Sequence, residues 1–169
     1  MTQVQRTERL TLRHFTEADA EFILRLVNEP SWLRYIGDRG VRTVEDAAAY
    51  LRERWMPAYE RHGYGLYLVE RTEDGVPLGM CGLVRRDTLE HADIGFAFLP
   101  EFWGQGYAAE SAAATLDEAR GLGMTHLLAI THPENESSIR LLEKIGFRSD
   151  GLTRLADDAD EVKLFARDL

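Results

Sequence analysis

The chain has 169 residues, 44% of them hydrophobic and 29% charged, and this length fits one domain, residues 1–169, with its own core. The formal net charge of −9 argues against a nucleic-acid partner, because phosphates need a basic surface, and favours cationic ligands such as amines. No apolar run is long enough to span a membrane, and no secretory signal is evident, so we expect no membrane partner. The single cysteine, Cys81, excludes an internal disulfide and indicates a cytoplasmic protein.

The first third of the chain predicts a strand followed by two capped helices. Residues 9–15 alternate leucines with polar neighbours, as a half-buried strand does. Residues 16–19 and 43–46 each begin with threonine and end with aspartate, which is typical of a capping box at a helix start. A short turn or helix is expected at 31–40, and Pro57 should kink or end the second helix.

The rest of the chain predicts a sheet with two further helices. Strands are expected at residues 64–71, 76–84, 92–99, 127–131, 147–155 and 162–167. Helices are expected at 108–119 and 135–144, the latter ending at a left-handed Gly146. The order β-αα-βββ-α-β-α-ββ predicts the α+β class, with a central mixed, mostly antiparallel sheet of about seven strands flanked by four or so helices.

Residues 102–111, FWGQGYAAES, are the most informative segment. Gly104 and Gly106 follow an apolar strand and lead into an alanine-rich helix, an arrangement that can be a plain tight turn or a phosphate site at a helix N-terminus. Residues 104–109 also match the dinucleotide fingerprint G-x-G-x-x-A, which makes a nucleotide-dependent oxidoreductase one alternative. That fingerprint needs an acidic residue about 20 positions on, and residues 129–131 are Ala-Ile-Thr.

A second motif, residues 135–147, reads NESSIRLLEKIGF and predicts an amphipathic helix capped by Asn135, with Ser138 one turn on. Together with the glycine turn, it resembles the GNAT superfamily of acetyl-CoA-dependent N-acetyltransferases. The resemblance is greatest to the branch that contains the ribosomal-protein N-terminal alanine acetyltransferases. Residues 7–13 resemble the first strand of that branch and residues 93–96 its fourth strand, so the likeness covers nearly the whole chain.

This resemblance implies a GNAT fold in which the family's strands 4 and 5 splay apart and hold acetyl-CoA as co-substrate. The pyrophosphate would bind Gly104, Gln105, Gly106, Tyr107 and Ala108. The pantetheine arm would lie against Phe96, Ala97, Phe98 and Leu99, where a backbone N–H can polarise the thioester carbonyl. Asn135 would bind the arm, and Ser138 would lie near the thiol.

The implied reaction is direct attack of a primary amine, on a protein N-terminus or a small molecule, on the acetyl thioester. Asp93 matches the position where a carboxylate often acts as base through water, although it can equally anchor a turn. His132 and His14 are further candidate bases. Glu110, in the first turn of the cofactor helix, is expected to be a structural acid because the helix dipole favours it there.

Three residues raise questions about the chemistry. Many members of the superfamily carry a tyrosine, the acid for the departing thiolate, where this chain has Leu142. Ser138 or water would then supply the proton, or the thiolate would leave unaided; a non-catalytic acyl-CoA-binding domain is the alternative. Trp103, where many relatives have Gln or Arg, is predicted to pack. Cys81 could form an acetyl-cysteine, but its apolar strand predicts a buried structural thiol.

The acceptor site is predicted around residues 36–41, a charged pair flanked by glycines. The resemblance places this region beside the acceptor, so Asp38, Arg39 and Tyr35 are candidate substrate contacts, with a simple turn salt bridge as the alternative for Asp38. Trp32, Tyr35, Trp55 and Tyr64 are candidates either for aromatic walls of that pocket or for the core. The histidines and the cysteine show no metal spacing, so no metal is expected. A monomer and a homodimer are both compatible with the sequence.

Overall fold

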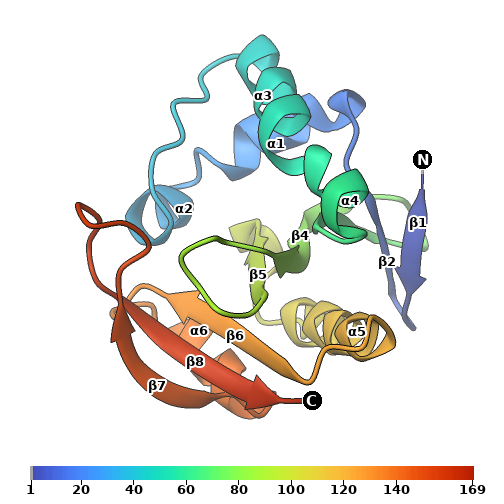
Figure 1. Ribbon diagram of the computed structural model, residues 1–169. Coiled ribbons are helices and arrows are strands. Elements are labelled where there is room, and N and C mark those ends of the chain that lie inside the picture. Colours follow the sequence, from blue (N-terminus) through green and yellow to red (C-terminus); the bar gives the residue numbers. More distant parts are fainter. Residues whose placement is uncertain (1) are drawn as a thin grey trace.

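The computed structural model describes residues 2–169 and arranges them around one eight-stranded sheet (Figure 1). Its strands are β1 (Gln3–Arg6), β2 (Leu10–His14), β3 (Leu66–Arg71), β4 (Pro77–Val84), β5 (Asp93–Phe98), β6 (His126–Thr131), β7 (Arg148–Thr153) and β8 (Val162–Asp168). Their order is β1-β2-β3-β4-β5-β6-β8-β7, and the neighbouring pairs are antiparallel except β5 and β6. The expected α+β class and mixed, mostly antiparallel sheet are confirmed.

The α-helices are α1 (Ala20–Leu26), α2 (Pro30–Tyr35), α3 (Val44–Tyr50), α4 (Pro57–His62), α5 (Tyr107–Gly121) and α6 (Glu136–Lys144). Both predicted capping boxes form. The N–H of Asp46 donates to Thr43 Oγ1 at 3.0 Å, and the N–H of Thr16 donates to the Asp19 carboxylate at 2.9 Å. A π-helical stretch (Leu51–Trp55) precedes Pro57, and α4 starts at this proline, a first-turn position that needs no N–H donor.

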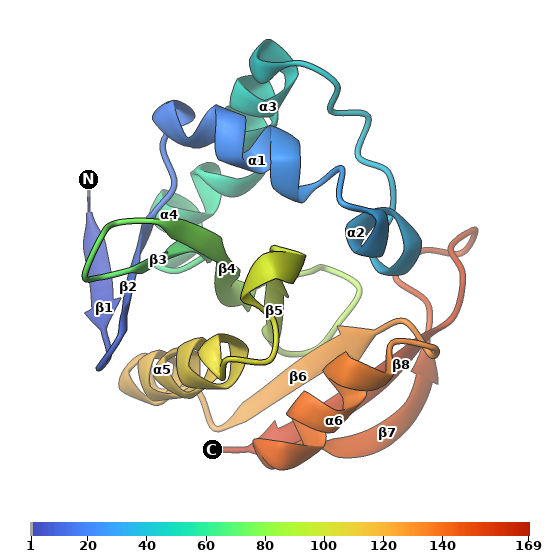
Figure 2. The ribbon, with the colours of Figure 1, turned by 180° about the vertical axis from the view of Figure 1, so that it is seen from behind.

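The helices cover both faces of the central strands, with α1 to α4 on one side and α5 and α6 on the other (Figures 1 and 2). Because successive side chains of a strand point to opposite faces, β4 contributes to both layers. Met80 packs with Ile23 of α1, and the next residue, Cys81, packs with Ala112 of α5. Two apolar cores therefore hold the middle strands in place between the helices.

The parallel strands β5 and β6 pair for only two residues and then part. Asp93 pairs with Leu128 and Ile94 with Ala129, whereas β5 pairs with β4 along its whole length. From Gly95 onward, the edge of β5 that faces β6 is open. The predicted splay is confirmed, and it opens the sheet at its centre.

Strand β1 is absent from the sequence-based prediction. Its four residues contain a single apolar side chain, Val4, and the strand lies at the edge of the sheet beside β2. An edge strand this short and polar gives no alternating pattern to detect. Among the described helices, none is both long and apolar enough to cross a membrane.

Candidate active site

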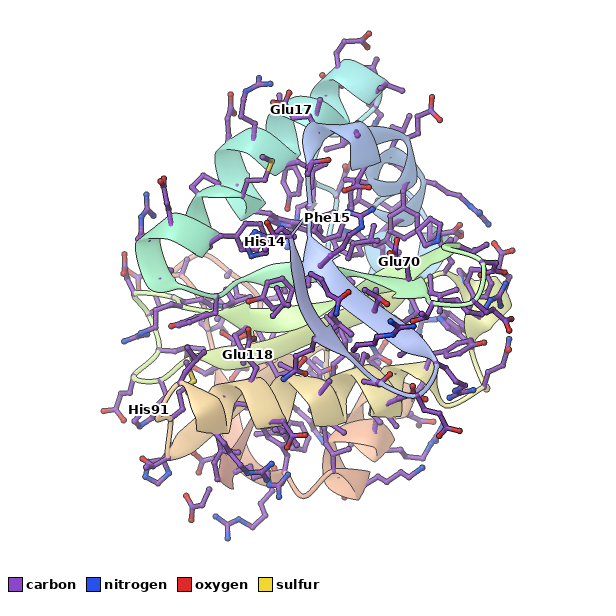
Figure 3. The ribbon with its side chains drawn as sticks, turned by 90° about the vertical axis from the view of Figure 1, so that its right-hand side faces the viewer. His14, Phe15, Glu17, Glu70, His91 and Glu118 are labelled. Carbon is purple, nitrogen blue, oxygen red and sulfur yellow. The ribbon has the colours of Figure 1, made fainter. Side chains whose placement is uncertain are left out.

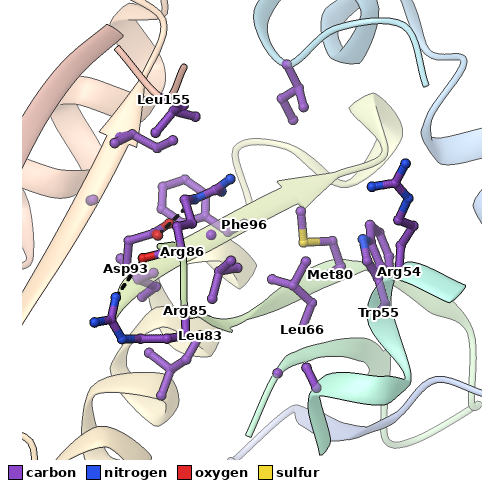
Figure 4. A pocket seen from close by; sticks show the side chains of 18 of the residues that line it. Arg54, Trp55, Leu66, Met80, Leu83, Arg85, Arg86, Asp93, Phe96 and Leu155 are labelled. Carbon is purple, nitrogen blue, oxygen red and sulfur yellow. Dashed lines mark hydrogen bonds and ion pairs between the residues drawn. The ribbon is translucent and has the colours of Figure 1, made fainter. Parts of the chain in front are cut away.

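A cavity of about 760 Å³ lies where β5 and β6 separate (Figure 4). This volume lies in the range of small-ligand sites. Its lining comes from the two strands, from α6 and from the helical layer on the other face of the sheet. Among the lining residues are Asp93, Gly95, Phe96, Thr131, Asn135, Ser138, Leu142, Trp32, Tyr35 and Trp55. The cavity therefore joins the N-terminal helices to the second sequence motif.

The glycine turn lies at the surface beyond the carboxyl end of β5. Gly104 and Gly106 have φ angles of 75° and 81°, in the left-handed region that favours glycine. The N–H of Glu110 donates to Gly106 O at 3.0 Å, so the N–H groups of residues 107–109 precede the helical ladder and are free for an anion. The turn is not among the described residues that line the cavity, so a ligand that reaches both must run along β5.

The backbone of β5 offers such a ligand an unpaired edge. The N–H of Leu99 donates to Leu78 O on β4 at 3.0 Å. Because peptide groups alternate in direction along a strand, the N–H groups of Phe96 and Phe98 point away from β4, toward the splay. The Phe98 carbonyl accepts the indole N–H of Trp103 at 2.9 Å. The prediction that Trp103 packs is wrong, because it is 54% exposed and makes this hydrogen bond at the surface.

The side chains of β5 differ in what they can contact. Those of Phe98 and Leu99 are buried in the two cores, and those of Phe96 and Ala97 are half-buried. Phe96 alone of these four lines the cavity. An arm that lay along this strand would therefore meet mainly its backbone.

Helix α6 begins at the cavity. Asn135 is its N-cap, as predicted, and its Oδ1 accepts the N–H of Ser138 at 3.3 Å. The amide Nδ2 of Asn135 has no partner among the described residues, which leaves a donor at the cavity wall. Leu142, at the position of the absent tyrosine, is buried and lines the same wall, where it offers no proton.

Asp93 is the carboxylate nearest the point of the splay. It starts β5, is only 1% exposed and accepts a hydrogen bond from Arg86 Nε at 3.0 Å, as Figure 4 shows. Burial raises the pKa of Asp93 above its ordinary value, although the Arg86 guanidinium acts to lower it. Because a raised pKa makes a carboxylate a stronger base, this buried cavity carboxylate is a candidate proton acceptor.

Glu110 ties the glycine turn to the turn between β1 and β2. Its carboxylate accepts the backbone N–H of Arg9 at 2.9 Å and Arg9 Nε at 2.8 Å, and Thr7 Oγ1 donates to it as well. Although burial acts to raise the pKa of Glu110, these hydrogen bonds leave it below its ordinary value. The structural role expected for Glu110 agrees with these contacts.

Arg9 also reaches the glycine turn itself. Its Nη1 donates to Gln105 O at 3.0 Å, and its guanidinium lies 4.5 Å from the centroid of the Tyr107 ring. This places a positive charge beside the free N–H groups. The sequence offers no signal for this contact, because Arg9 and Gln105 are 96 residues apart.

The family model described as an acetyltransferase (GNAT) domain matches residues 9–148, which include both motifs and the whole splayed region. The chain belongs to the GNAT acetyltransferase family. The resemblance seen in the sequence is thereby confirmed, as are the expected fold of this acetyltransferase and its class as an N-acetyltransferase enzyme.

Relatives and solved structures agree with this assignment. The uncharacterized N-acetyltransferase YoaA of Bacillus subtilis (strain 168) is 29% identical over 156 residues, which cover 91% of this chain and 88% of YoaA. An acetyltransferase from Agrobacterium tumefaciens str. C58 has a TM-score of 0.82 at 24% identity, covering 99% and 94% of the two chains. RimL, a ribosomal L7/L12 alpha-N-protein acetyltransferase in complex with coenzyme A, has a TM-score of 0.83 at 20% identity, covering 99% and 98%. These last two likenesses concern the fold.

The two histidines of this acetyltransferase that were candidate bases lie in different places. Nδ1 of His132, at the cavity, accepts the N–H of Glu134 at 3.0 Å. A neutral imidazole in that arrangement carries its proton on Nε2, so His132 faces ligands as a donor. His14, labelled in Figure 3, stacks on Tyr59 with 3.8 Å between ring centroids. It is not among the described cavity residues. Neither geometry favours a general base.

The predicted acceptor residues share the cavity. Asp38, Arg39 and Tyr35 all line it. Asp38 is exposed, accepts the N–H of Gly40 at 2.8 Å and forms a salt bridge with Arg42. The turn salt bridge that was the alternative for Asp38 is therefore present.

The aromatic candidates divide between the cavity and the edge of the core, where Tyr64 is partly buried. Trp32, Tyr35 and Trp55 line the cavity, and the two tryptophans also belong to the buried core. Tyr64 lies outside the lining and stacks on His62. The indole N–H of Trp32 is buried and has no acceptor among the described residues.

Cys81 has the surroundings of a structural thiol. It is fully buried against α5, with its Sγ 3.3 Å from Thr115 Oγ1, and burial raises the pKa of the thiol to about 11. It is not among the described residues that line the cavity. Within residues 2–169, no three His, Cys, Asp or Glu side chains gather as metal ligands.

Proposed function

We propose that this protein transfers the acetyl group of acetyl-CoA to a primary amine by direct attack. The observation that carries the proposal is the parting of β5 and β6, which leaves an unpaired strand edge between the glycine turn and the cavity. An extended thioester cofactor needs such a track, with an anion site at one end and room for an acceptor at the other. The coenzyme A complex of RimL, which shares the fold, supports this cofactor.

The cofactor would be held mostly by backbone groups. Its pyrophosphate would accept the N–H groups of residues 104–108, and its pantetheine arm would lie along residues 96–99. The free Nδ2 of Asn135 would donate to the arm, and Ser138 would lie near the sulfur. At the splay, the N–H of Phe96 would donate to the thioester oxygen, and one such preorganised donor contributes about 10²–10³ in rate.

In the proposed reaction the amine nitrogen attacks the thioester carbon, a C–N bond forms and the C–S bond breaks. Asp93, through water, takes the proton that the amine must lose, a contribution of about 10²–10⁴-fold. The electron pair of the broken bond leaves on sulfur as thiolate. Ser138 or water then protonates that sulfur, because Leu142 cannot.

We further propose that residues 1–169 act as one domain in a reducing compartment such as the cytoplasm. Support comes from the sheet, which joins β1 and β8 from the two ends of the chain, and from the free, buried Cys81. The acceptor would be the amine of a protein N-terminus or of a small molecule, with no nucleic-acid or membrane partner. The active species would be a monomer or a homodimer.

The test of the cofactor site compares two glycines with the same backbone strain. Gly104 and Gly123 both have positive φ, and a Cβ added at either meets no heavy atom within 4 Å. Gly104→Val and Gly123→Val should each lose roughly 1–3 kcal/mol of stability. Only Gly104→Val should weaken coenzyme A binding, by more than about tenfold, because its side chain blocks close approach of the pyrophosphate. Equal affinities in titration calorimetry would show that the turn is not the phosphate site.

The test of activity is amine-dependent release of free thiol from acetyl-CoA. A non-catalytic acyl-CoA-binding domain would bind the cofactor but release no thiol with any amine. Thermal shifts distinguish the proposed acetyltransferase from a nucleotide-dependent oxidoreductase, since a ligand at a hundred times its Kd adds about 2.7 kcal/mol to the free energy of unfolding. Coenzyme A should raise Tm and NAD should not.

A further inference from the structure

The cavity has a charge opposite to that of the whole protein. The chain carries 29 acidic and 20 basic residues, for a formal charge of −9. The cavity lining nevertheless has more arginines than carboxylates. The arginines are Arg39, Arg54, Arg61, Arg85 and Arg86, and the carboxylates are Asp38, Glu53 and Asp93.

Ion pairs increase this local excess. Asp93 is paired with Arg86, and Asp38 is paired with Arg42, which lies outside the lining. Glu53 is thus the one carboxylate of the described lining without a paired arginine. Four arginines of the lining also have no ion pair within the described chain: Arg39, Arg54, Arg61 and Arg85.

None of these four arginines has an ion-pair partner among residues 2–169. For Arg39, Arg54 and Arg61 the described chain supplies no hydrogen-bond acceptor either. Arg85 donates to the backbone carbonyls of Leu89 at 2.7 Å and Glu90 at 3.2 Å, which orients its guanidinium and leaves its charge intact. Unpaired guanidinium groups around a cavity are suited to a carboxylate or phosphate.

The arginines come from separate elements that face the same space. Arg54 lies in the π-helical stretch and Arg61 on α4, seven residues later. Arg85 and Arg86 follow β4, and Figure 4 shows them across the cavity from Arg54. The folding of the chain, and no single motif, concentrates the charge here.

The proposed cofactor does not explain this charge. Its phosphates would sit on the glycine turn, which lies outside the lining, and its pantetheine arm is neutral. We propose, on the basis of the proposed function, that the acceptor is an amine that also carries a carboxylate. The amine would approach Asp93, and the carboxylate would meet Arg54 and Arg61. A free amino acid, or a peptide with an acidic residue next to its N-terminal amine, has this chemistry.

The experiment compares acceptors that differ by replacement of one carboxylate with its amide. Amino acids are paired with their carboxamides, and peptides with Asp as the second residue are paired with their Asn counterparts, with thiol release as the readout. We expect kcat/KM to be roughly tenfold or more higher for the acid of each pair. The amino-acid arm and the peptide arm distinguish a small acceptor from a protein N-terminus.

Variants of Arg54 and Arg61 test whether the unpaired arginines of the cavity cause the preference for acids. Arg54→Gln and Arg61→Gln should each lower the acid-to-amide ratio of kcat/KM by roughly fivefold to tenfold. Arg52→Gln is the matched control, because Arg52 lies in the same helical stretch, is exposed and is outside the lining. In the wild-type protein, raising the ionic strength should raise KM for the acid and not for the amide, a test that needs no variant.

The outcomes separate the two proposals. Turnover with neutral or cationic amines and no preference for acids would overturn this inference and leave the proposed function standing. Turnover with no amine of any charge would overturn both. An acid-to-amide ratio that falls equally in Arg52→Gln would also overturn the inference, since the preference would then not come from the arginines that line the cavity.

Discussion

The glycine turn offers backbone N–H groups from one short segment, residues 104–108. The unpaired arginines of the cavity, in contrast, come from four separate segments of the chain, at Arg39, Arg54, Arg61 and Arg85. Backbone donors change little when side chains change, so the turn suits a cofactor shared by a whole family. Side chains from separate elements can be replaced one at a time, which suits an acceptor that differs among relatives. The two regions thus separate what the proposed reaction needs in every case from what selects its substrate.

Asp93 lies in the cavity at the start of β5, and its replacement should have the largest effect. Asp93→Asn should lower kcat by about 10²-fold or more, because the proposed general base is lost. The raised pKa of Asp93 predicts that wild-type kcat/KM falls as pH drops through a value above that of an ordinary aspartate, since protonation removes the base. Pre-steady-state and steady-state pH profiles measure this. A kcat within about threefold of wild type at every pH would assign the role to another group.

A variant of Arg86 tests whether Asp93 controls the acidic limb of the pH profile. Arg86→Gln removes the cation that lowers the pKa of Asp93, so the acidic limb of the profile should move to higher pH. Arg34→Gln removes an exposed ion pair outside the cavity and should leave the limb in place. An unchanged limb in both variants would show that Asp93 does not control it.

The next largest effect is expected at the turn. Arg9→Ala should weaken coenzyme A binding by roughly tenfold, because the turn loses its hydrogen bond to Gln105 and a neighbouring positive charge. Arg6→Ala is the control, since Arg6 is exposed on β1 and makes no ion pair within the described chain. Titration calorimetry at two salt concentrations measures both. Equal affinity for coenzyme A in the two variants would show that Arg9 does not contribute to the cofactor site.

The smallest effect is expected at Cys81. Cys81→Ala should keep kcat within about twofold, because the thiol is buried against α5 with a pKa of about 11 and takes no part in direct attack. Intact-protein mass spectrometry after mixing with acetyl-CoA should find no acetylated protein. An acetyl-cysteine that forms and decays at the rate of turnover would replace direct attack by a two-step mechanism.

Features that depend on a few neighbouring residues were predictable. The capping boxes at Thr16 and Thr43, the Asn135 cap and the left-handed Gly146 each depend on contacts within about four residues. The succession of strands along the chain followed from their patterns, apart from the short polar β1. The family followed from two such local motifs in the right order.

Features that depend on distant contacts were missed. Arg9 and Glu110 meet across 101 residues, and no local pattern marks either as a partner of the other. Trp103 reads as an apolar residue beside a helix, but the end of β5 presents a carbonyl to its indole. The whole-chain charge of −9 favours a cationic ligand but does not show that arginines outnumber carboxylates around the cavity, because a sum over the sequence has no information about where the fold places each charge.

The sequence by itself determined the α+β fold, the family and the segments of the proposed cofactor site, because hydrophobic period, caps and glycine turns act over a few residues. Only the tertiary structure decided which carboxylates are already paired and which arginines stay free around the cavity. Coulomb interactions depend on distance in space and on burial, and neither can be read from separation along the chain. Short motifs therefore define the proposed cofactor end of the site, whereas the proposed acceptor end depends on α4 and the loop after β4 lining one cavity with the splayed strands.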